Sequence, residues 1–230
     1  LETMDALIAA AHRAKYLAVS HVTTERVARH LVEHGLDGIV HVSPQARFGA
    51  DYGTLLKKRG TFQSTNLIGV APAEVRRGLG KDTTLAPYLP SWLAEDLAAT
   101  ADSPRERYDT ELANFGLVRD AKVPILAGTD GFFPYAPLLH GELEILSGDG
   151  KLGAIGALQA ATSNVAQAYR LKDRGRIARG LRADLLLVDG DPTTDIRATR
   201  HINAVWVAGQ AVDREALRAS VTAIAKPARR

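Results

Sequence analysis

Along the first third of the chain, apolar positions with helical spacing alternate with short continuous apolar runs. Residues 4–14 are rich in alanine and predict a helix, and residues 16–21 form an apolar run with a polar end, as is typical of a buried strand. Residues 23–35 open with two threonines that can cap a helix, carry an apolar face and end at a glycine. Residues 38–42 predict the next strand. This order of strand, helix and strand predicts parallel neighbouring strands.

The middle of the chain is less regular. Residues 60–65 predict a third strand, and several prolines within residues 72–90 mark a long excursion. Residues 123–130 predict a fourth strand, with Pro124 near its start, where the missing backbone N–H is tolerated. Helices are predicted at 105–120, 138–146 and 156–169.

The pattern changes in the last quarter of the chain. Residues 183–188 and 202–207 predict two strands, with the turn-forming residues 189–192 between them. We therefore expect an α/β part over residues 1–172 and a small β module over residues 173–230.

Composition narrows the class of protein. With 230 residues, 46% of them hydrophobic, the chain can bury a full core, and 24% charged residues argue against a disordered tail. Twenty-nine basic against 26 acidic residues leave a formal charge of +3, part of it from two arginines at the C-terminus. A pI near 9.2 is then weak evidence for nucleic acid, and we expect no such partner.

Several kinds of site and location are excluded or disfavoured. The chain has no cysteine, which excludes disulfides, thiolate metal sites and a cysteine nucleophile. No apolar run approaches the roughly 18 residues of a membrane span, and no signal peptide is visible, so we expect a cytoplasmic protein with no membrane partner. The sequence opens at Leu1, inside a predicted helix, which suggests a fragment or a processed piece.

Three polar residues stand at the carboxyl ends of predicted strands. His21 and His41 end two neighbouring strands, and Asp130 ends the fourth. In a parallel sheet or barrel these ends lie on one face, where catalytic residues gather. Because adjacent strands lie about 4.8 Å apart, two imidazoles and a carboxylate can meet there on one zinc-like divalent ion, at about 2.0–2.1 Å per bond. The alternative is that each is an ordinary polar residue at a strand end.

Several runs follow one another in the order found in a known family. They are AAH at 10–12, VSHVTT at 19–24, GLDGIVHV at 35–42, PILAGTD at 124–130, LHGELE at 139–144, ALQAAT at 157–162, GRIARGLRADL at 175–185 and VWVAG at 205–209. The first three resemble strands five and six of the amidohydrolase superfamily barrel, the fourth resembles strand eight, and the rest are similar to the family's C-terminal signature. The similarity is greatest to the subgroup of imidazolonepropionases, prolidase-like and carbamate-cleaving enzymes. It covers most of the chain apart from residues 80–104.

The resemblance implies a fold and a chemistry. The fold is α/β, a partial (β/α)8 barrel of the TIM type that comprises strands five to eight, with a portion of a small C-terminal β-sandwich. His21 and His41 are implied to be metal ligands, and Asp130 the metal-side carboxylate and general base. One or two divalent ions, zinc foremost, would generate hydroxide that attacks an amide, carbamate or ester carbonyl of a small-molecule substrate.

Two departures from the family bear on activity. The family's first strand carries a His-x-His pair, and no two of the seven histidines here stand two apart. Its fourth strand usually carries a bridging lysine, and this chain starts after that point. Four strands cannot close as eight do, and they leave two exposed sheet edges. The alternative is therefore a catalytically incomplete half-barrel that works only as a homo-oligomer or with a partner that carries the other half.

Two short motifs offer other interpretations. HLVEH at residues 30–34 matches the H-x-x-E-H pattern of inverted zinc peptidases, with Glu33 as the base, which makes a zinc peptidase the second alternative. By helical angle, however, His30 and His34 point to solvent. GDGKLG at 148–153 fits G-x-G-x-x-G but follows a helix, which favours a loop between helices.

Aromatic residues and one more histidine follow Asp130. Phe132, Phe133 and Tyr135 either line a pocket mouth or pack within their loop. His140 either approaches the substrate or belongs to the start of a helix, and it is the candidate replacement ligand if the metal site recruits one.

Overall fold

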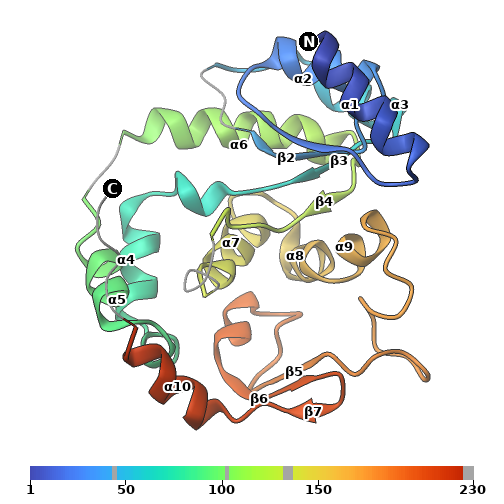
Figure 1. Cartoon of the computed structure of the whole chain (residues 1–230). Coiled ribbons are helices and arrows are strands. Elements are labelled where there is room, and N and C mark those ends of the chain that lie inside the picture. Colours follow the sequence, from blue (N-terminus) through green and yellow to red (C-terminus); the bar gives the residue numbers. More distant parts are fainter. Residues whose placement is uncertain (43–45, 102–103, 132–136, 225–230) are drawn as a thin grey trace.

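A computed structural model of the chain describes residues 1–42, 46–101, 104–131 and 137–224 (Figure 1). The elements are, in order, α1 (Glu2–Arg13), β1 (Val19–Val22), α2 (Glu25–Glu33), β2 (Gly38–Val42), α3 (Tyr52–Arg59), β3 (Phe62–Ser64), η1 (Leu67–Gly69), α4 (Ala73–Lys81), η2 (Ala86–Tyr88), α5 (Ser91–Ala98), α6 (Arg105–Asp120), β4 (Ile125–Leu126), α7 (Leu138–Ser147), α8 (Gly153–Ala161), α9 (Ser163–Ala168), β5 (Leu185–Val188), η3 (Ile196–Arg200), β6 (Ile202–Val207), β7 (Gln210–Ala211) and α10 (Arg214–Thr222).

Strands β1 to β4 form one parallel sheet in which their spatial order is their order in the chain (Figure 1). Helices lie between successive strands: α2 after β1, α3 after β2, and α4 to α6 after β3. Parallel strands require such crossovers, because the chain must return to the same end of the sheet. The predicted parallel pairing is confirmed, and the carboxyl ends of all four strands lie at one edge of the sheet.

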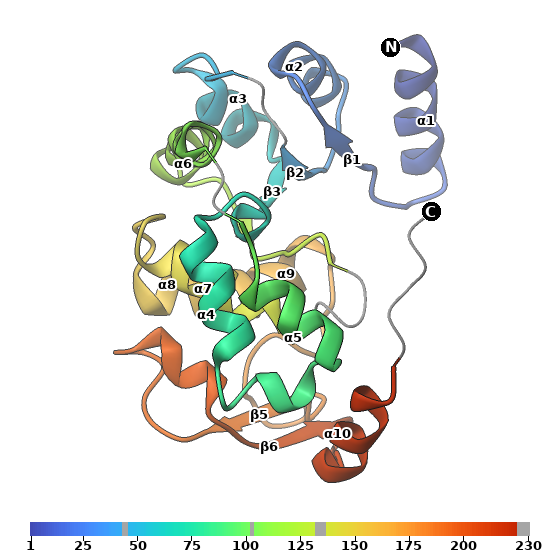
Figure 2. The ribbon, with the colours of Figure 1, turned by 90° about the vertical axis from the view of Figure 1, so that its left-hand side faces the viewer.

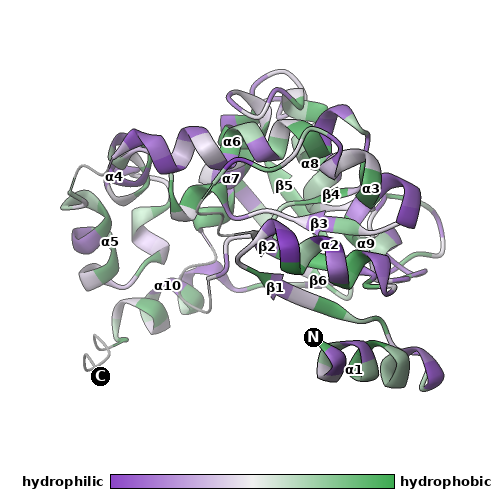
Figure 3. Cartoon of the chain, turned by 90° about the horizontal axis from the view of Figure 1, so that it is seen from above, coloured by the Kyte–Doolittle hydropathy of each residue, from purple (hydrophilic) through white to green (hydrophobic). Residues whose placement is uncertain are grey.

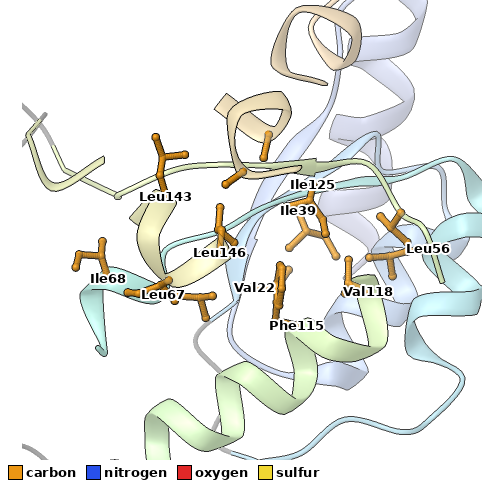
Figure 4. Close-up of a cluster of buried hydrophobic side chains, with 14 of the residues drawn as sticks. Val22, Ile39, Leu56, Leu67, Ile68, Phe115, Val118, Ile125, Leu143 and Leu146 are labelled. Atoms are coloured by element: carbon orange, nitrogen blue, oxygen red, sulfur yellow. The ribbon is translucent and has the colours of Figure 1, made fainter. Parts of the chain in front are cut away.

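The sheet and its helices share one apolar core (Figure 4). Val22 and Ile39 of neighbouring strands are 1% and 0% exposed, and they belong to the same cluster as Phe115 and Val118 of α6. Helices α2, α3 and α6 lie on one side of the sheet, while α7 and α8 lie on the other side near β4 (Figure 2). Each buried aliphatic side chain of this kind contributes about 1.5–3 kcal/mol to stability.

The outer edge of β4 is covered by helices. Ala127 N–H donates to the carbonyl of Ala160 in α8 at 2.9 Å, and Asn164 Nδ2 of α9 donates to the carbonyl of Ile125 at 3.1 Å. These bonds satisfy backbone groups that an open sheet edge would leave unpaired. The expectation of two exposed edges is therefore wrong for β4.

The single helix predicted over residues 156–169 is two helices, α8 and α9. They meet at Thr162, whose φ of −133° and ψ of −89° are not helical. Thr162 Oγ1 donates to the carbonyl of Leu158 at 2.7 Å, a side-chain bond that competes with regular helical bonding. The break lets the end of α8 and the side chain of Asn164 both reach β4.

The proline-rich excursion contains two helices that the sequence pattern did not predict. Pro72 and Pro90 directly precede α4 and α5, with φ of −49° and −54°. Proline is as compatible with a helix start as it is with a helix end. The two helices pack closely through Gly80, where an added Cβ would lie 2.6 Å from the carbonyl oxygen of Ala94.

Strands β5, β6 and β7 form a small antiparallel sheet near the C-terminus. Ion pairs of limited exposure connect this part to the α/β part: Arg200 of η3 contacts Asp82 at 2.8 Å and also Glu144 of α7, and the exposures of the Arg200, Asp82 and Glu144 side chains are 14%, 15% and 23%. The division of the chain at residues 172 and 173 stays a prediction.

Helix α1 lies at the margin of the fold (Figures 2 and 3). Apolar and polar positions alternate along it, and only Ile8 is fully buried. Polar contacts therefore contribute to its attachment. His12 Nε2 lies 2.8 Å from Asp37 Oδ2, and His30 Nε2 of α2 lies 2.8 Å from Asp5 Oδ1.

Helix α7 carries a fully buried acid, Glu142. Its Oε2 accepts a hydrogen bond from Ile68 N–H at 2.7 Å, whereas Oε1 has no partner among the described residues. Burial raises the pKa of Glu142 to about 7, although bonds from the Thr65 hydroxyl and from Ile68 act in the opposite direction. Glu142 is thus protonated in the folded state over a range in which it is ionised in the unfolded chain.

We expect Glu142→Gln to flatten the pH dependence of stability. A pKa of about 7 in the folded state against 4.5 in the unfolded chain means that stability present at low pH is lost as the pH rises through 7. When the pH is raised from about 5 to about 8, the free energy of unfolding of the variant should increase by roughly 2–3 kcal/mol relative to that of the wild type. Urea unfolding of both proteins at both pH values measures this change. If the difference in unfolding free energy between variant and wild type is the same at both pH values, Glu142 is ionised inside the fold.

Candidate functional site

The structure brings the three predicted site residues together at the carboxyl ends of the strands. His21 lies in β1, His41 in β2, and Asp130 in the segment after β4. His21 Nδ1 lies 3.2 Å from His41 Nε2, and His41 Nε2 lies 3.4 Å from Asp130 Oδ1. The two imidazole rings meet edge to face with their centroids 4.4 Å apart. The side chains converge as expected from their strand-end positions, while their role as ligands stays a prediction.

The backbone is irregular at these positions. The register of β1 and β2 shifts between Ser20 and Val22, so His21 stands opposite two residues of β2, the second of which is His41. Without this extra residue, side-chain alternation would turn His41 to the other face of the sheet. His41 and Asp130 have φ of 36° and 51°, a region that non-glycine residues rarely adopt and that is concentrated at functional sites.

Two of the three separations between donor atoms are those expected for ligands of one ion. Tetrahedral bonds of about 2.0–2.1 Å put two ligand atoms about 3.3 Å apart, and the observed separations are 3.2 and 3.4 Å. Burial lowers the pKa of His41; Asp130 acts to raise it and His21 to lower it further. A neutral imidazole is the form that binds a metal. The pairs His21–His41 and His41–Asp130 therefore fit a divalent ion, with His41 as the middle donor. His21 and Asp130 would have to move closer together to share it, because the donor atoms of the three residues do not all lie within 4.8 Å of one another.

Close approach of β4 to β3 shapes this edge of the sheet. A Cβ at Gly128 would lie 2.7 Å from Ser64 Oγ and 2.8 Å from the carbonyl oxygen of Thr65. No side chain fits at position 128 without pushing away the segment that leads to Asp130. The close contact with Ser64 and Thr65 thus explains why position 128 requires glycine.

A second polar group, which the sequence pattern did not predict, lies on the α6 side of the same edge. A cavity there is lined by residues 63–67 and by α6, including Glu111 and Asn114. Asn114 accepts from Phe48 N–H at 2.8 Å and donates to the carbonyl of Ala46 at 3.1 Å, so α6 anchors the segment after β2. Burial raises the pKa of Glu111 to about 7. Polar residues three apart on the apolar face of the predicted helix are the signal that could have found them.

The histidines of the H-x-x-E-H run lie elsewhere, between α1 and α2. His30 is only 26% exposed because it contacts Asp5 of α1. The expectation that His30 points to solvent is therefore wrong, since α1 covers that side of α2. His34 and Glu33 are exposed. Among the described residues, Asp5, His30 and His34 are the one group whose donor atoms all lie within 4.8 Å of one another.

The remaining candidates have structural surroundings or are not described. His140 lies near the start of α7 with Nδ1 3.0 Å from Thr199 Oγ1, and burial, aided by Arg200, lowers its pKa to about 4. It therefore joins α7 to the C-terminal sheet region. The GDGKLG run joins α7 and α8, as predicted. Phe132, Phe133 and Tyr135 lie outside the described residues.

Comparison with known proteins identifies relatives. Residues 2–213 match a family model described as the amidohydrolase family. One stretch of 71 residues is 41% identical to adenine deaminase 2 of Desulfotalea psychrophila, and it covers 31% of this chain and 11% of that protein.

Solved structures share the fold. A prolidase in complex with N-methylphosphonate-L-proline matches with a TM-score of 0.68 at 21% identity, over 91% of this chain and 48% of that chain. Molinate hydrolase matches with a TM-score of 0.67 at 22% identity, over 98% of this chain and 49% of that chain. Phenylurea hydrolase B matches with a TM-score of 0.61 at 26% identity, over 94% of this chain and 48% of that chain.

The chain thus spans about half the length of the solved structures it matches. Its α/β fold with a parallel sheet corresponds to about half of the amidohydrolase barrel structures, and a small antiparallel sheet is present besides. None of the helices among the described residues combines the length and apolar character of a membrane span. Because the family match covers nearly all of the sequence, the chain belongs to the amidohydrolase family.

Proposed function

We propose that this chain supplies part of the metal centre of a hydrolase that cleaves an amide, carbamate or ester bond in a small molecule. The convergence of His21, His41 and Asp130 at the carboxyl ends of parallel strands carries the proposal. In barrel enzymes this face holds the active site. Family membership, with hydrolases among the similar structures, supports the class of reaction.

The roles follow from the atoms that face one another. His21 would bind the ion through Nδ1 and His41 through Nε2. A divalent ion held by these residues would lower the pKa of a bound water and polarise the substrate carbonyl. Asp130 would accept the water's proton and pass it to the leaving group; its side chain is 58% exposed, so water and substrate can reach it. Zinc, as one ion or two, suits this set of nitrogen and oxygen donors.

We infer that β1 to β4 correspond to strands five to eight of an eight-stranded TIM-type barrel. Their unbroken parallel order and the helices between them support this assignment. We also assign β5 to β7, within residues 173–230, to a portion of a small β-sandwich.

The outer edge of β1 favours a chain that works together with further strands. No described strand pairs with that edge, and Tyr16 and Val19 beside it are 72% and 41% exposed. An exposed apolar edge is a template for pairing with another chain. We propose that a second copy, or a partner with the other half of the barrel, covers it, and that the half-barrel alone is catalytically incomplete. The cytoplasmic location stays a prediction.

We expect the chain to self-associate through the β1 edge. Light scattering after size-exclusion chromatography should give a mass above 24.7 kDa. Val19→Lys puts a charge on the edge and should shift the protein toward the monomer. Val207→Lys, at a position that is 49% exposed in β6, is the matched control and should not. If the wild type is a monomer at all concentrations, self-association through this edge is refuted, and only a different partner chain could cover it.

We expect weak metal binding at the strand ends, because three protein ligands are present without the family's His-x-His pair. After dialysis the zinc attributable to this site, measured as the difference between wild type and His41→Ala, should be well below one equivalent. His12→Ala, which alters a histidine far from the strand ends in the fold, is the control. Near-stoichiometric zinc that disappears with His41→Ala would show that the three residues suffice.

We expect Asp130→Asn to reduce hydrolysis by about 10²–10⁴-fold, in this chain or with the rest of the barrel restored, because an amide keeps the shape but takes no proton. Glu33→Ala removes an exposed side chain and should leave the rate nearly unchanged. The zinc-peptidase alternative predicts the reverse, since Glu33 is then the base. Rates of both variants on one amide or ester substrate separate the two functions.

A further inference from the structure

The H-x-x-E-H run has no part in the proposed hydrolase, yet its two histidines belong to a cluster with metal-ligand chemistry. Asp5 comes from α1, His30 comes from the last turn of α2, and His34 is the residue directly after α2. We propose that these three residues form a second, structural metal site, which binds zinc and fastens α1 to α2.

The donor atoms need little movement to reach a common ion. His30 Nε2 lies 2.8 Å from Asp5 Oδ1 and 3.0 Å from Oδ2, and His34 Nε2 lies 3.9 Å from Oδ2. Two ligands of a tetrahedral zinc lie about 3.3 Å apart, so the observed distances are within roughly 0.6 Å of that value. The two imidazoles are stacked, with centroids 4.0 Å apart and planes 19° apart, so at least one ring has to rotate before both Nε2 lone pairs point at one ion.

The helix backbone orients one of the two imidazoles. His34 Nδ1 lies 2.7 Å from the carbonyl oxygen of His30. Since a carbonyl only accepts, Nδ1 carries a hydrogen, and Nε2 is the nitrogen that faces Asp5. Such a bond to the non-coordinating nitrogen orients metal-binding histidines and sets their tautomer.

The position of the site gives it a structural role. Helix α1 buries only Ile8, so few apolar contacts hold it. An ion shared by Asp5, His30 and His34 would replace one hydrogen-bonded pair with three bonds across two helices. The side chains of Asp5, His30 and His34 are 27%, 26% and 46% exposed, which leaves an entry path and a fourth position for water.

The site differs from a peptidase centre in its third donor, which is Asp5 of another helix. It also shares no residue with the strand-end group of His21, His41 and Asp130. Its existence is therefore independent of the proposed hydrolase function, and either can fail alone.

A zinc titration on the His41→Ala background tests the site without a contribution from the strand ends. We expect one equivalent to bind, and His34→Gln or Asp5→Asn to weaken the affinity by at least about tenfold, since loss of a supporting residue alone costs 10–100-fold. His12→Gln is the matched control: it is also an exposed histidine next to a carboxylate, Asp37, but it has no second histidine. Equal affinity in His34→Gln and His12→Gln, or no binding in the parent, would overturn the proposal.

Hydrogen exchange tests whether the ion joins the helices. Zinc should slow amide exchange across α1 in the His41→Ala parent and leave it unchanged in His34→Gln. At a zinc concentration about 100 times the Kd, the Tm should rise by roughly 5–10 °C. His34→Gln removes a half-exposed side chain, so its fold should survive, and its Tm without zinc checks this. Zinc bound with no slowing of exchange in α1 would refute the fastening role.

Discussion

Parallel pairing of β1 to β4 is the constraint on which the rest of the structure depends. It places the carboxyl ends of all four strands at one edge of the sheet. Residues that are far apart in the chain therefore lie close together there because their strands are paired. Pairing alone is not sufficient for the site, because strict alternation would turn His41 away from His21. The one-residue bulge in β2 turns the His41 side chain to the same face of the sheet as His21, and His41 has an unusual positive φ there. The same edge thus combines regular pairing with one local departure from it.

The two outer strands of this sheet are in opposite situations. The edge of β4 is satisfied by the end of α8 and by Asn164, whereas no described strand or helix bond covers the outer edge of β1. A barrel closes by joining such edges. An open edge at β1, next to a site with three donors, is consistent with a catalytic centre that further strands complete.

Surroundings, more than residue type, decide what each histidine can do in this molecule. His41 has close donors and a lowered pKa at a strand end; His140 is buried against Thr199 and joins two parts of the fold. His30 pairs with Asp5 between helices, and His12 pairs with Asp37 near the surface. A histidine count from the sequence therefore says little about metal sites until the partners of each ring are known.

Local physics allowed the sequence by itself to determine a good part of this protein. Hydrophobic spacing predicted β2 and α6 with the boundaries that the structure has, and the predicted cap Thr24 accepts a hydrogen bond from Val27 N–H at the start of α2. The sequence also predicted that His21, His41 and Asp130 stand at strand ends, since these positions depend only on where the apolar runs end.

Only the tertiary structure decided the features that depend on contacts distant in sequence. These are the bulge that turns His41, the covering of the β4 edge by α8 and Asn164, the packing of α4 on α5 through Gly80, and the covering of His30 by α1. Each results from a neighbour that no local pattern encodes: a paired strand, a sheet edge or an adjoining helix. Periodicity fixes which face of an element is apolar, but what lies against that face is set by the packing of the whole chain.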